Sequence, residues 1–515
     1  MYAPIQFEPA VEALVRFVEE TSPDKLVSAT LDKLRAGALP TDLVRAAALA
    51  VIRSTELPAS HHGGAVHPIS GLHGCLHAAK RLSGEMSFLP IVQHVAVCNH
   101  HIHSPHMGPY IMPDLTPRDG SVDDAYEVFH DSESSVVHIG TASTSSSDKT
   151  RLDSTVAAFM NNVHSRRPVA AEQCLLWLLE HQTPGEVLDH LLPLCVSRNH
   201  MDDHNFLYPV LSAMALEDIG WDWARVLLRP VVRYHARQPS NITIDPEFKP
   251  TLIDEAMAAH GLLDKQLAVK TNAAESDQIE SLANAIASGR KFADGIGLSA
   301  QALAEGLSLE GVGEALSIAA SRVFVSTTYG NPMDSHLHTG ATTRRFLVRL
   351  PGVSQRTRVS ALLSGLTGPE CTCSEELMVA QPRAPTAVPA GGPEQLAEAI
   401  VECIEGQPIV DWRATLRIDE LSAPQAAWDA MALAHAYLER GGGAQRLFDK
   451  LAEFVSRDDF TELHSIKQHQ AIVDEYNTTR ESLRDVHVIA AVKSAACVRS
   501  GKEQTVYEQL QPLLH

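Results

Sequence analysis

Histidines are concentrated in one short segment near the start of the chain. Five of them lie within the seventeen residues 61–77, HHGGAVHPISGLHGCLH. Pro68 suits the first turn of a helix, because the N–H that proline lacks would have no partner there. His73 and His77 would then share one helix face, since residues four apart lie one above the other. Two imidazoles one turn apart are a way for a helix to bind a first-row transition metal.

The number of histidines in the whole chain gives a competing explanation. The chain has 26 histidines among 515 residues, so some clustering is expected by chance. A single histidine beside a helix more often faces solvent or lies near a helix end than binds a metal. The segment therefore predicts a metal site only if histidines elsewhere in the chain can reach it.

Three further segments repeat the arrangement of a polar turn with histidine followed by a helix. They are MDDHNFLYPVLSAMAL at 201–216, MDSHLHTGATTRRFL at 333–347 and FTELHSIKQHQAIVDEY at 460–476. Their spacing is irregular, so they are not a countable repeat. With the first segment they suggest four helical hairpins around a shared centre. The alternative is that Asp203 only caps a helix, and that His336 and His338 lie in an ordinary polar turn.

Lys467 is the most unusual residue of the fourth segment. It follows His464 by three residues and therefore shares its helix face. A lysine that faces the protein interior is costly unless it is paired or neutralised. The alternative is that its long side chain reaches solvent, as most such lysines do.

The elements that must position these residues are helices. Apolar residues recur at spacings of three and four, as in VEALVRFVEETSPDKLVSATLDKLRAG, which predicts an all-α fold, an irregular multi-helix array with short loops or hairpins inserted. Residues 1–366 form a helical region with most of the histidine motifs, and residues 367–396 are a Pro- and Gly-rich linker or surface excursion. Residues 397–515 form a C-terminal helical region that packs back on the first.

Composition narrows the classes of partner. With 42 Lys and Arg against 63 Asp and Glu, the net charge of −21 repels phosphate backbones, so no nucleic acid is expected. No apolar run is long enough to span a bilayer, and the first residues do not form a signal peptide. The eight cysteines are scattered, which indicates reduced thiols and a cytoplasmic protein. The oligomeric state stays open.

Four stretches together resemble one family. GLHGCLHAA, HNFLYPVLSAMAL, HLHTGATTRRFLV and LHSIKQHQAIVDEY, in this order, resemble segments of the questin oxidase family. The resemblance covers most of the chain in motif order but rests on short stretches. It implies an oxygenase that cleaves aromatic rings, typically of anthraquinones, with O₂. It also implies, for some members, a non-haem iron held by four histidines and a carboxylated lysine.

The resemblance assigns ligands residue by residue. His204 matches the histidine that opens the middle apolar helix, His338 the one before the Thr-Thr pair, and Lys467 the late lysine. The N-terminal segment departs from the family pattern. His62, His67 and His73 are its candidates, of which at most two are expected to be ligands.

The chemistry of these side chains supports the same assignment. A neutral lysine adds CO₂ to give a carbamate, which is an anionic oxygen ligand, and burial favours the neutral amine. Imidazoles with one hard anion suit Fe(II) and leave a position for O₂. A carbamate on Lys467 would explain an inward lysine that otherwise lacks a partner.

The function expected from the sequence is a metal-dependent, non-haem iron oxygenase that oxidises or cleaves an aromatic, polyketide-like small molecule with O₂. Alternatives are a zinc-type hydrolase that uses bound hydroxide, and a helical scaffold that binds other proteins. A monooxygenase that uses NADPH has no supporting motif: GIGLSA at 295–300 follows no predicted strand, so no cofactor-binding residue is predicted. The residues acting in catalysis and the substrate are not predicted.

Overall fold

The structure is a computed structural model. It describes residues 3–56, 64–107, 110–120, 148–198, 203–237, 251–289, 292–327, 330, 336–365, 385, 388–406, 423–458, 461–498 and 505–514. Most of the predicted linker at 367–396 lies outside these ranges.

The predicted all-α fold is confirmed. Within the described ranges the chain forms helices, and its one β feature is an isolated antiparallel bridge between Pro4 and Pro113. No helix in this part of the chain combines the length and the apolar character needed to cross a lipid bilayer.

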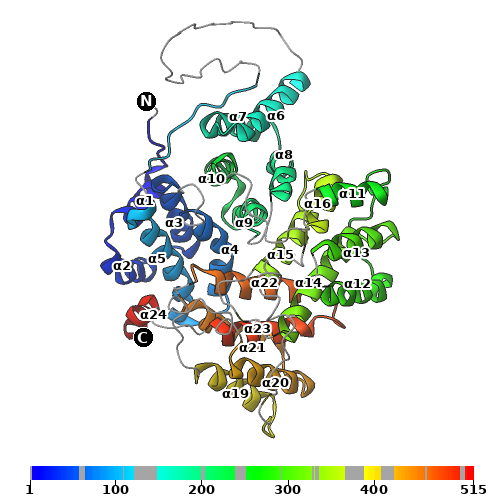
Figure 1. Cartoon of the computed structure of the whole chain (residues 1–515). Helices are drawn as coiled ribbons and strands as arrows, with labels where there is room; N and C mark the ends of the chain where they lie inside the picture. Colours follow the sequence, from blue (N-terminus) through cyan, green and yellow to red (C-terminus); the bar gives the residue numbers. More distant parts are fainter. Residues whose placement is uncertain are drawn as a thin grey trace, which may run out of the picture.

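The N-terminal helices form one group (Figure 1). In it α3 packs against α1 and α5, and α4 packs against α5. The bounds are α1 Pro9–Glu20, α2 Pro23–Arg35, α3 Pro40–Ser54, α4 Val66–Ala79 and α5 Leu89–His103.

Two further groups follow along the chain. In the second, α7 packs against α6 and α10, and α10 packs against α9. In the third, α14 packs against α12 and α15. The bounds are α6 Asp148–His164, α7 Pro168–His181, α8 Pro184–Ser197, α9 His204–Ile219, α10 Ala224–Arg237, α11 Thr251–Ala259, α12 Ser276–Ser288, α13 Phe292–Ala304, α14 Leu309–Ser326, α15 His336–Arg349 and α16 Gln355–Leu363.

The last helices pack on the earlier ones. α20 packs against α19 and α23, while α22 packs against α4, α15 and α23. α24 returns to α2 and α5 of the N-terminal group. The bounds are α19 Pro393–Glu405, α20 Gln425–Glu439, α21 Ala444–Ser456, α22 His464–Thr478, α23 Asp485–Val498 and α24 Thr505–Leu510.

The starts of several helices are set by particular residues. Six α-helices of the described chain begin with a proline, whose fixed φ suits the first turn. α9 and α22 instead begin with a histidine, and the residue before each has a left-handed backbone: φ is 52° at Asp203 and 71° at Leu463. Such a backbone is uncommon for residues other than glycine and costs about 1–3 kcal/mol, so the packing around it must hold it in place.

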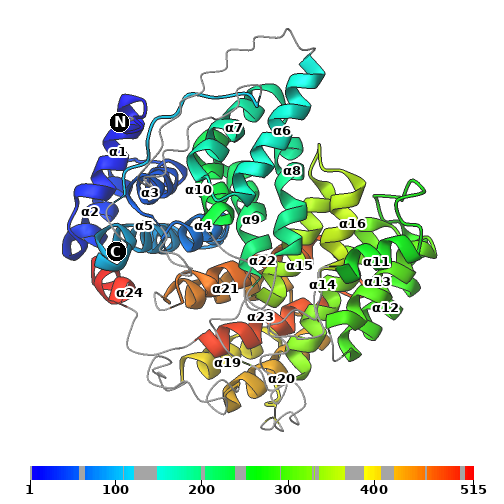
Figure 2. The same cartoon turned by 45° about the horizontal axis from the view of Figure 1, so that its top comes forward.

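The helices that carry the four histidine segments come together at the centre of the fold. α4 packs against α9 and α22, and α15 packs against the same two helices. Figures 1 and 2 both show α22 between α4 and α15. Four segments that are distant in sequence therefore become neighbours, as the interpretation of four hairpins around one centre required.

Two glycines allow α4 and α22 to approach closely. A Cβ atom added to Gly71 would lie 2.5 Å from Leu463 Cδ1, and one added to Gly74 would lie 3.3 Å from the carbonyl oxygen of Ile466. The side chain of Leu463 thus occupies the space that a larger residue at 71 would need. This contact helps to hold the left-handed backbone before His464.

We predict that Gly71→Ala destabilises the fold although alanine is the better helix former. Overpacking against Leu463 should lower the free energy of unfolding by about 1–3 kcal/mol, which chemical denaturation would measure. Gly297→Ala in α13 is the matched control, because nothing lies within 4 Å of its added Cβ; it should stabilise by up to about 1 kcal/mol. Equal effects of the two substitutions would show that the close approach of α4 and α22 is not required.

Candidate metal centre

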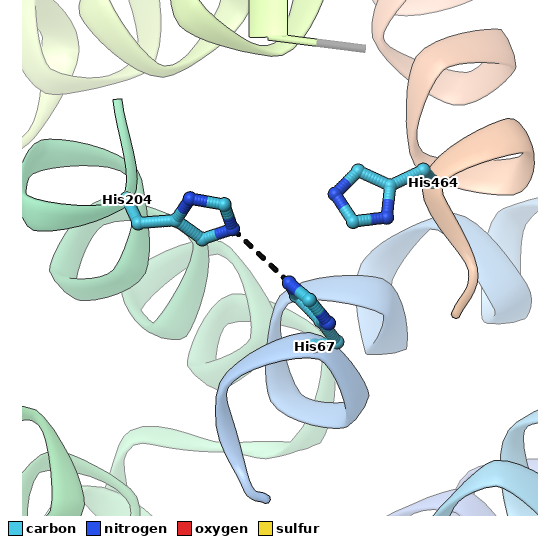
Figure 3. Close-up of side chains that lie close together, drawn as sticks. All are labelled: His67, His204 and His464. Atoms are coloured by element: carbon cyan, nitrogen blue, oxygen red, sulfur yellow. Dashed lines mark hydrogen bonds between the residues drawn. The ribbon is translucent and has the colours of Figure 1, made fainter. Parts of the chain in front are cut away.

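Three histidines from distant parts of the chain meet where α4, α9 and α22 begin (Figure 3). His67, His204 and His464 each offer a ring nitrogen, and these nitrogens lie within 4.8 Å of one another. The Nε2 atoms of His67 and His204 are 3.0 Å apart. Two nitrogens bound at right angles to one ion, with bonds of about 2.1 Å, would also be about 3.0 Å apart. The spacing of the rings therefore fits a single transition-metal ion.

A fourth imidazole, that of His336, borders the same space. Its ring centroid lies 4.7 Å from that of His204 and 5.3 Å from that of His464. His336 is the first residue of α15, and all four histidines are buried. Each of the four segments thus contributes one histidine from the first turn of its helix.

Contacts on the far side of two rings set their orientation. His67 Nδ1 contacts the carboxylate of Glu462, and His464 Nδ1 lies 2.5 Å from the carbonyl oxygen of Thr461. Because a carboxylate and a carbonyl oxygen can only accept a hydrogen bond, the ring proton of each histidine lies on Nδ1. The Nε2 atom then carries a lone pair that is directed toward the cluster. His464 Nε2 is buried and has no hydrogen-bond partner among the described residues. A buried acceptor of this kind is a fitting ligand for a metal.

The surroundings keep the imidazoles of His67 and His464 neutral. Burial lowers the pKa of His67 and of His464 well below the usual value, and the nearby amine of Lys467 lowers both further. The N-terminal end of a helix carries partial positive charge, which also disfavours an imidazolium. Neutral imidazole is the form that binds metals, so no proton has to be displaced.

Lys467 is buried one turn after His464, as the inward position predicted from the sequence required. Burial lowers its pKa to about 7, although the negative charge of Glu462 acts in the opposite direction. Its amine has no hydrogen bond to another residue in the described part of the chain. An amine with a pKa in this range is partly uncharged at neutral pH.

A buried ion pair fixes the start of α9 to α15. Arg344 donates from Nη1 to Asp203 Oδ2 at 2.8 Å and from Nη2 to Asp203 Oδ1 at 3.1 Å. Its guanidinium also lies over the ring of Phe206, 4.4 Å from the centroid. The pair holds Asp203, and with it the backbone that aims His204. The Asp203 side chain makes no helix-capping hydrogen bond, so Asp203 positions His204 through this ion pair and through its backbone.

The structure places the other predicted ligands elsewhere. His62 lies outside the described residues. His338, although two positions from His336, points away from the cluster: its Nδ1 lies 3.1 Å from Gln468 Nε2, and its ring packs on Phe324. His73 lies further along α4, where its Nδ1 is 2.6 Å from Asp218 Oδ2. Successive helix residues are rotated by about 100°, so His336 and His338 cannot face the same point.

His336 and His464 belong to the cluster but were not predicted as ligands. The signal that marks them is the position at which each helix begins. In the second, third and fourth segments, the first helical residue is the histidine that joins the cluster. The prediction of His338 was based on its position before the Thr-Thr pair, whereas His336, two residues earlier, is the first residue of the helix.

A cavity adjoins the cluster on the side of Glu462. Its volume is about 500 Å³, and α2, α5 and α24 form most of its wall. His101 and Glu462 also line it, with His101 Nε2 3.9 Å from Glu462 Oε2. Cavities of this volume hold small organic molecules.

Comparison with models of protein families, with curated proteins and with solved structures finds no match for this chain.

We predict that Glu462→Gln weakens metal binding without unfolding the protein. Loss of the carboxylate behind His67 should lower the affinity for Fe(II) about 10- to 100-fold, measured anaerobically by competition with a chromogenic chelator. Glu453→Gln is the matched control, since Glu453 lies on α21 outside the cluster and forms an ion pair with Arg457, the residue that follows this helix. If Glu462→Gln bound Fe(II) as tightly as the wild type, Glu462 would not contribute to the metal centre.

Proposed function

We propose that the protein is a non-haem iron oxygenase that uses O₂ to oxidise or cleave an aromatic, polyketide-like small molecule. The observation that carries the proposal is the meeting of four buried imidazoles at the starts of four helices, with the buried Lys467 one turn away. Imidazole donors suit zinc, copper, iron and nickel rather than magnesium or calcium.

The number of donors favours iron over zinc. Structural zinc is usually four-coordinate, and catalytic zinc usually has three protein ligands. His67, His204, His336 and His464 with a modified Lys467 would supply five donors. Five donors suit a six-coordinate ion such as Fe(II) and leave one position for O₂. When bound, the iron would supply the activation of O₂.

Lys467 is proposed to carry a carbamate. The neutral amine attacks CO₂, an N–C bond forms, and the nitrogen releases one proton to solvent; the product is an anionic oxygen donor. Burial supplies the neutral amine. The partial positive charge at four helix N-termini stabilises an anion at this point, whereas it repels an ammonium.

The remaining residues supply orientation and exclusion of water. Glu462 and the Thr461 carbonyl hold the ring protons of His67 and His464 on the side away from the ion. The cavity beside Glu462 is our candidate for the aromatic substrate, because its volume of about 500 Å³ suits a fused-ring molecule.

We predict that His336→Ala loses iron whereas His338→Ala retains it. Only the ring of His336 borders the cluster. His338 lies on the same helix with its ring elsewhere, so His338→Ala is the control for His336→Ala. Iron per chain, measured by elemental analysis, should be lower by about one in His336→Ala and in His204→Ala than in the wild type. Consumption of O₂ with a panel of hydroxylated anthraquinones should fall with the iron.

The same measurement tests the proposed function. Wild-type protein that retains zinc rather than iron and consumes no O₂ would contradict an oxygenase and favour a hydrolase. Wild-type protein that retains no metal would contradict both.

We predict that metal-free protein forms a carbamate on Lys467 in the presence of ¹³CO₂. A carbamate signal should appear in the ¹³C NMR spectrum of the wild type and be absent from Lys467→Met. Because the pKa is about 7, the neutral amine increases above pH 7 and the signal should weaken below it. Lys493→Met is the control, since Lys493 is also buried but its amine donates 2.8 Å to the Thr327 carbonyl oxygen. A signal that disappears in Lys493→Met and persists in Lys467→Met would overturn the assignment.

A further inference from the structure

A second group of histidines and carboxylates lies on the same three helices, beyond the first cluster. It consists of His73 and His77 on α4, Asp218 on α9 and Asp474 on α22. His73 is six residues after His67, which is about 9 Å along a helix. None of its members belongs to the first cluster.

The donor atoms of this group converge. Asp218 Oδ2 lies 2.6 Å from His73 Nδ1, and Asp218 Oδ1 lies 2.9 Å from His77 Nε2. The two imidazole centroids are 4.2 Å apart. Each oxygen of one carboxylate thus faces a different imidazole, and the three donors lie within 4.8 Å of one another.

We propose that His73, His77 and Asp218 bind a second divalent first-row transition-metal ion, with Asp474 orienting His73. Two imidazoles and one carboxylate are a donor set for zinc and iron sites. His73 Nε2 lies 3.1 Å from Asp474 Oδ2, so Asp474 accepts its N–H while Nδ1 faces the ion. This carboxylate–histidine–metal arrangement recurs at metal sites.

The position of Asp218 in its helix favours a cation at this place. It is the second-last residue of α9, where the helix end carries partial negative charge. A carboxylate there is unfavourable unless positive charge lies next to it. Burial alone would lower the pKa of His73, but Asp218 and Asp474 raise it to about 9, so an ion that binds here displaces a proton from His73. With both aspartates ionised, a divalent ion would then neutralise the group.

The proposed second site is accessible to ions from solution. The side chains of His73, His77 and Asp218 keep 16%, 29% and 14% of their surface exposed, whereas the first cluster is buried. Three protein ligands and partial exposure leave room for bound water. This site is independent of the proposed oxygenase function, because it shares no ligand with the first centre.

Titration with Co²⁺ tests this proposal. Full-length protein stripped of metal with a chelator would be titrated at pH 8 and followed by visible absorption and calorimetry. We expect two Co²⁺ per wild-type chain and one in Asp218→Asn and in His77→Gln. His204→Ala should also bind one ion, with the spectrum of the second site. His190→Ala, on α8 outside both groups, should bind two.

The outcomes separate the two centres. If the wild type binds one ion that His204→Ala loses and Asp218→Asn keeps, the second site does not exist and the first centre stands. If the wild type binds one ion that Asp218→Asn loses and His204→Ala keeps, the second site stands and the centre of the proposed oxygenase fails. If Asp218→Asn loses helical circular dichroism, His77→Gln decides, because it leaves both carboxylates in place.

Discussion

The convergence of four helix N-termini on one buried point is the constraint on which the rest of the structure depends. The N-terminal ends of α4, α9, α15 and α22 each direct partial positive charge toward this point. Positive charge in a buried space excludes imidazolium and ammonium groups, and it favours neutral donors and anions. Burial lowers the pKa of both His67 and His464, and the field acts in the same direction. The field would also stabilise an anionic derivative of Lys467 there.

The helix ends can direct this charge toward the cluster only because the strained backbone before two of the helices is held in place. Asp203 and Leu463 have left-handed backbones immediately before His204 and His464. Arg344 holds Asp203 through two hydrogen bonds, and the missing side chain of Gly71 leaves space for Leu463. Strain of this kind persists where surrounding packing fixes it, and it is concentrated at functional sites. Asp203 and Leu463 are each adjacent in sequence to the histidine that they aim, and Glu462, with a φ of 51°, precedes Leu463.

Periodicity and composition predicted the helical fold, because helices are specified by residues that are close in sequence. The face shared by His73 and His77 and the burial of Lys467 followed from the same local rule. The sequence could not decide between His336 and His338, since the two face different sides of α15 and the choice depends on the exact residue at which that helix begins, which sequence gives only to within a few residues. It also could not separate His67 from His73, because the two lie on one helix and only the positions of α9 and α22 assign them to different groups. Contacts between distant segments decide these points, and periodicity carries no information about them.

The two proposed metal-binding groups differ because they lie at different positions along the same helices. Near the N-terminal ends, helix charge is positive, the side chains are buried, and imidazoles are the donors. Further along, Asp218 lies near the negative end of α9, and carboxylates from two helices face His73. A cation beside Asp218 would offset a negative charge that the C-terminal end of α9 makes unfavourable. A cation in the first cluster would instead be repelled by the positive helix ends, so that bonds to its ligands would have to hold it. The first centre therefore needs more donors than the second. It draws one histidine from each of four helices, while two imidazoles and one carboxylate suffice where the field already favours positive charge.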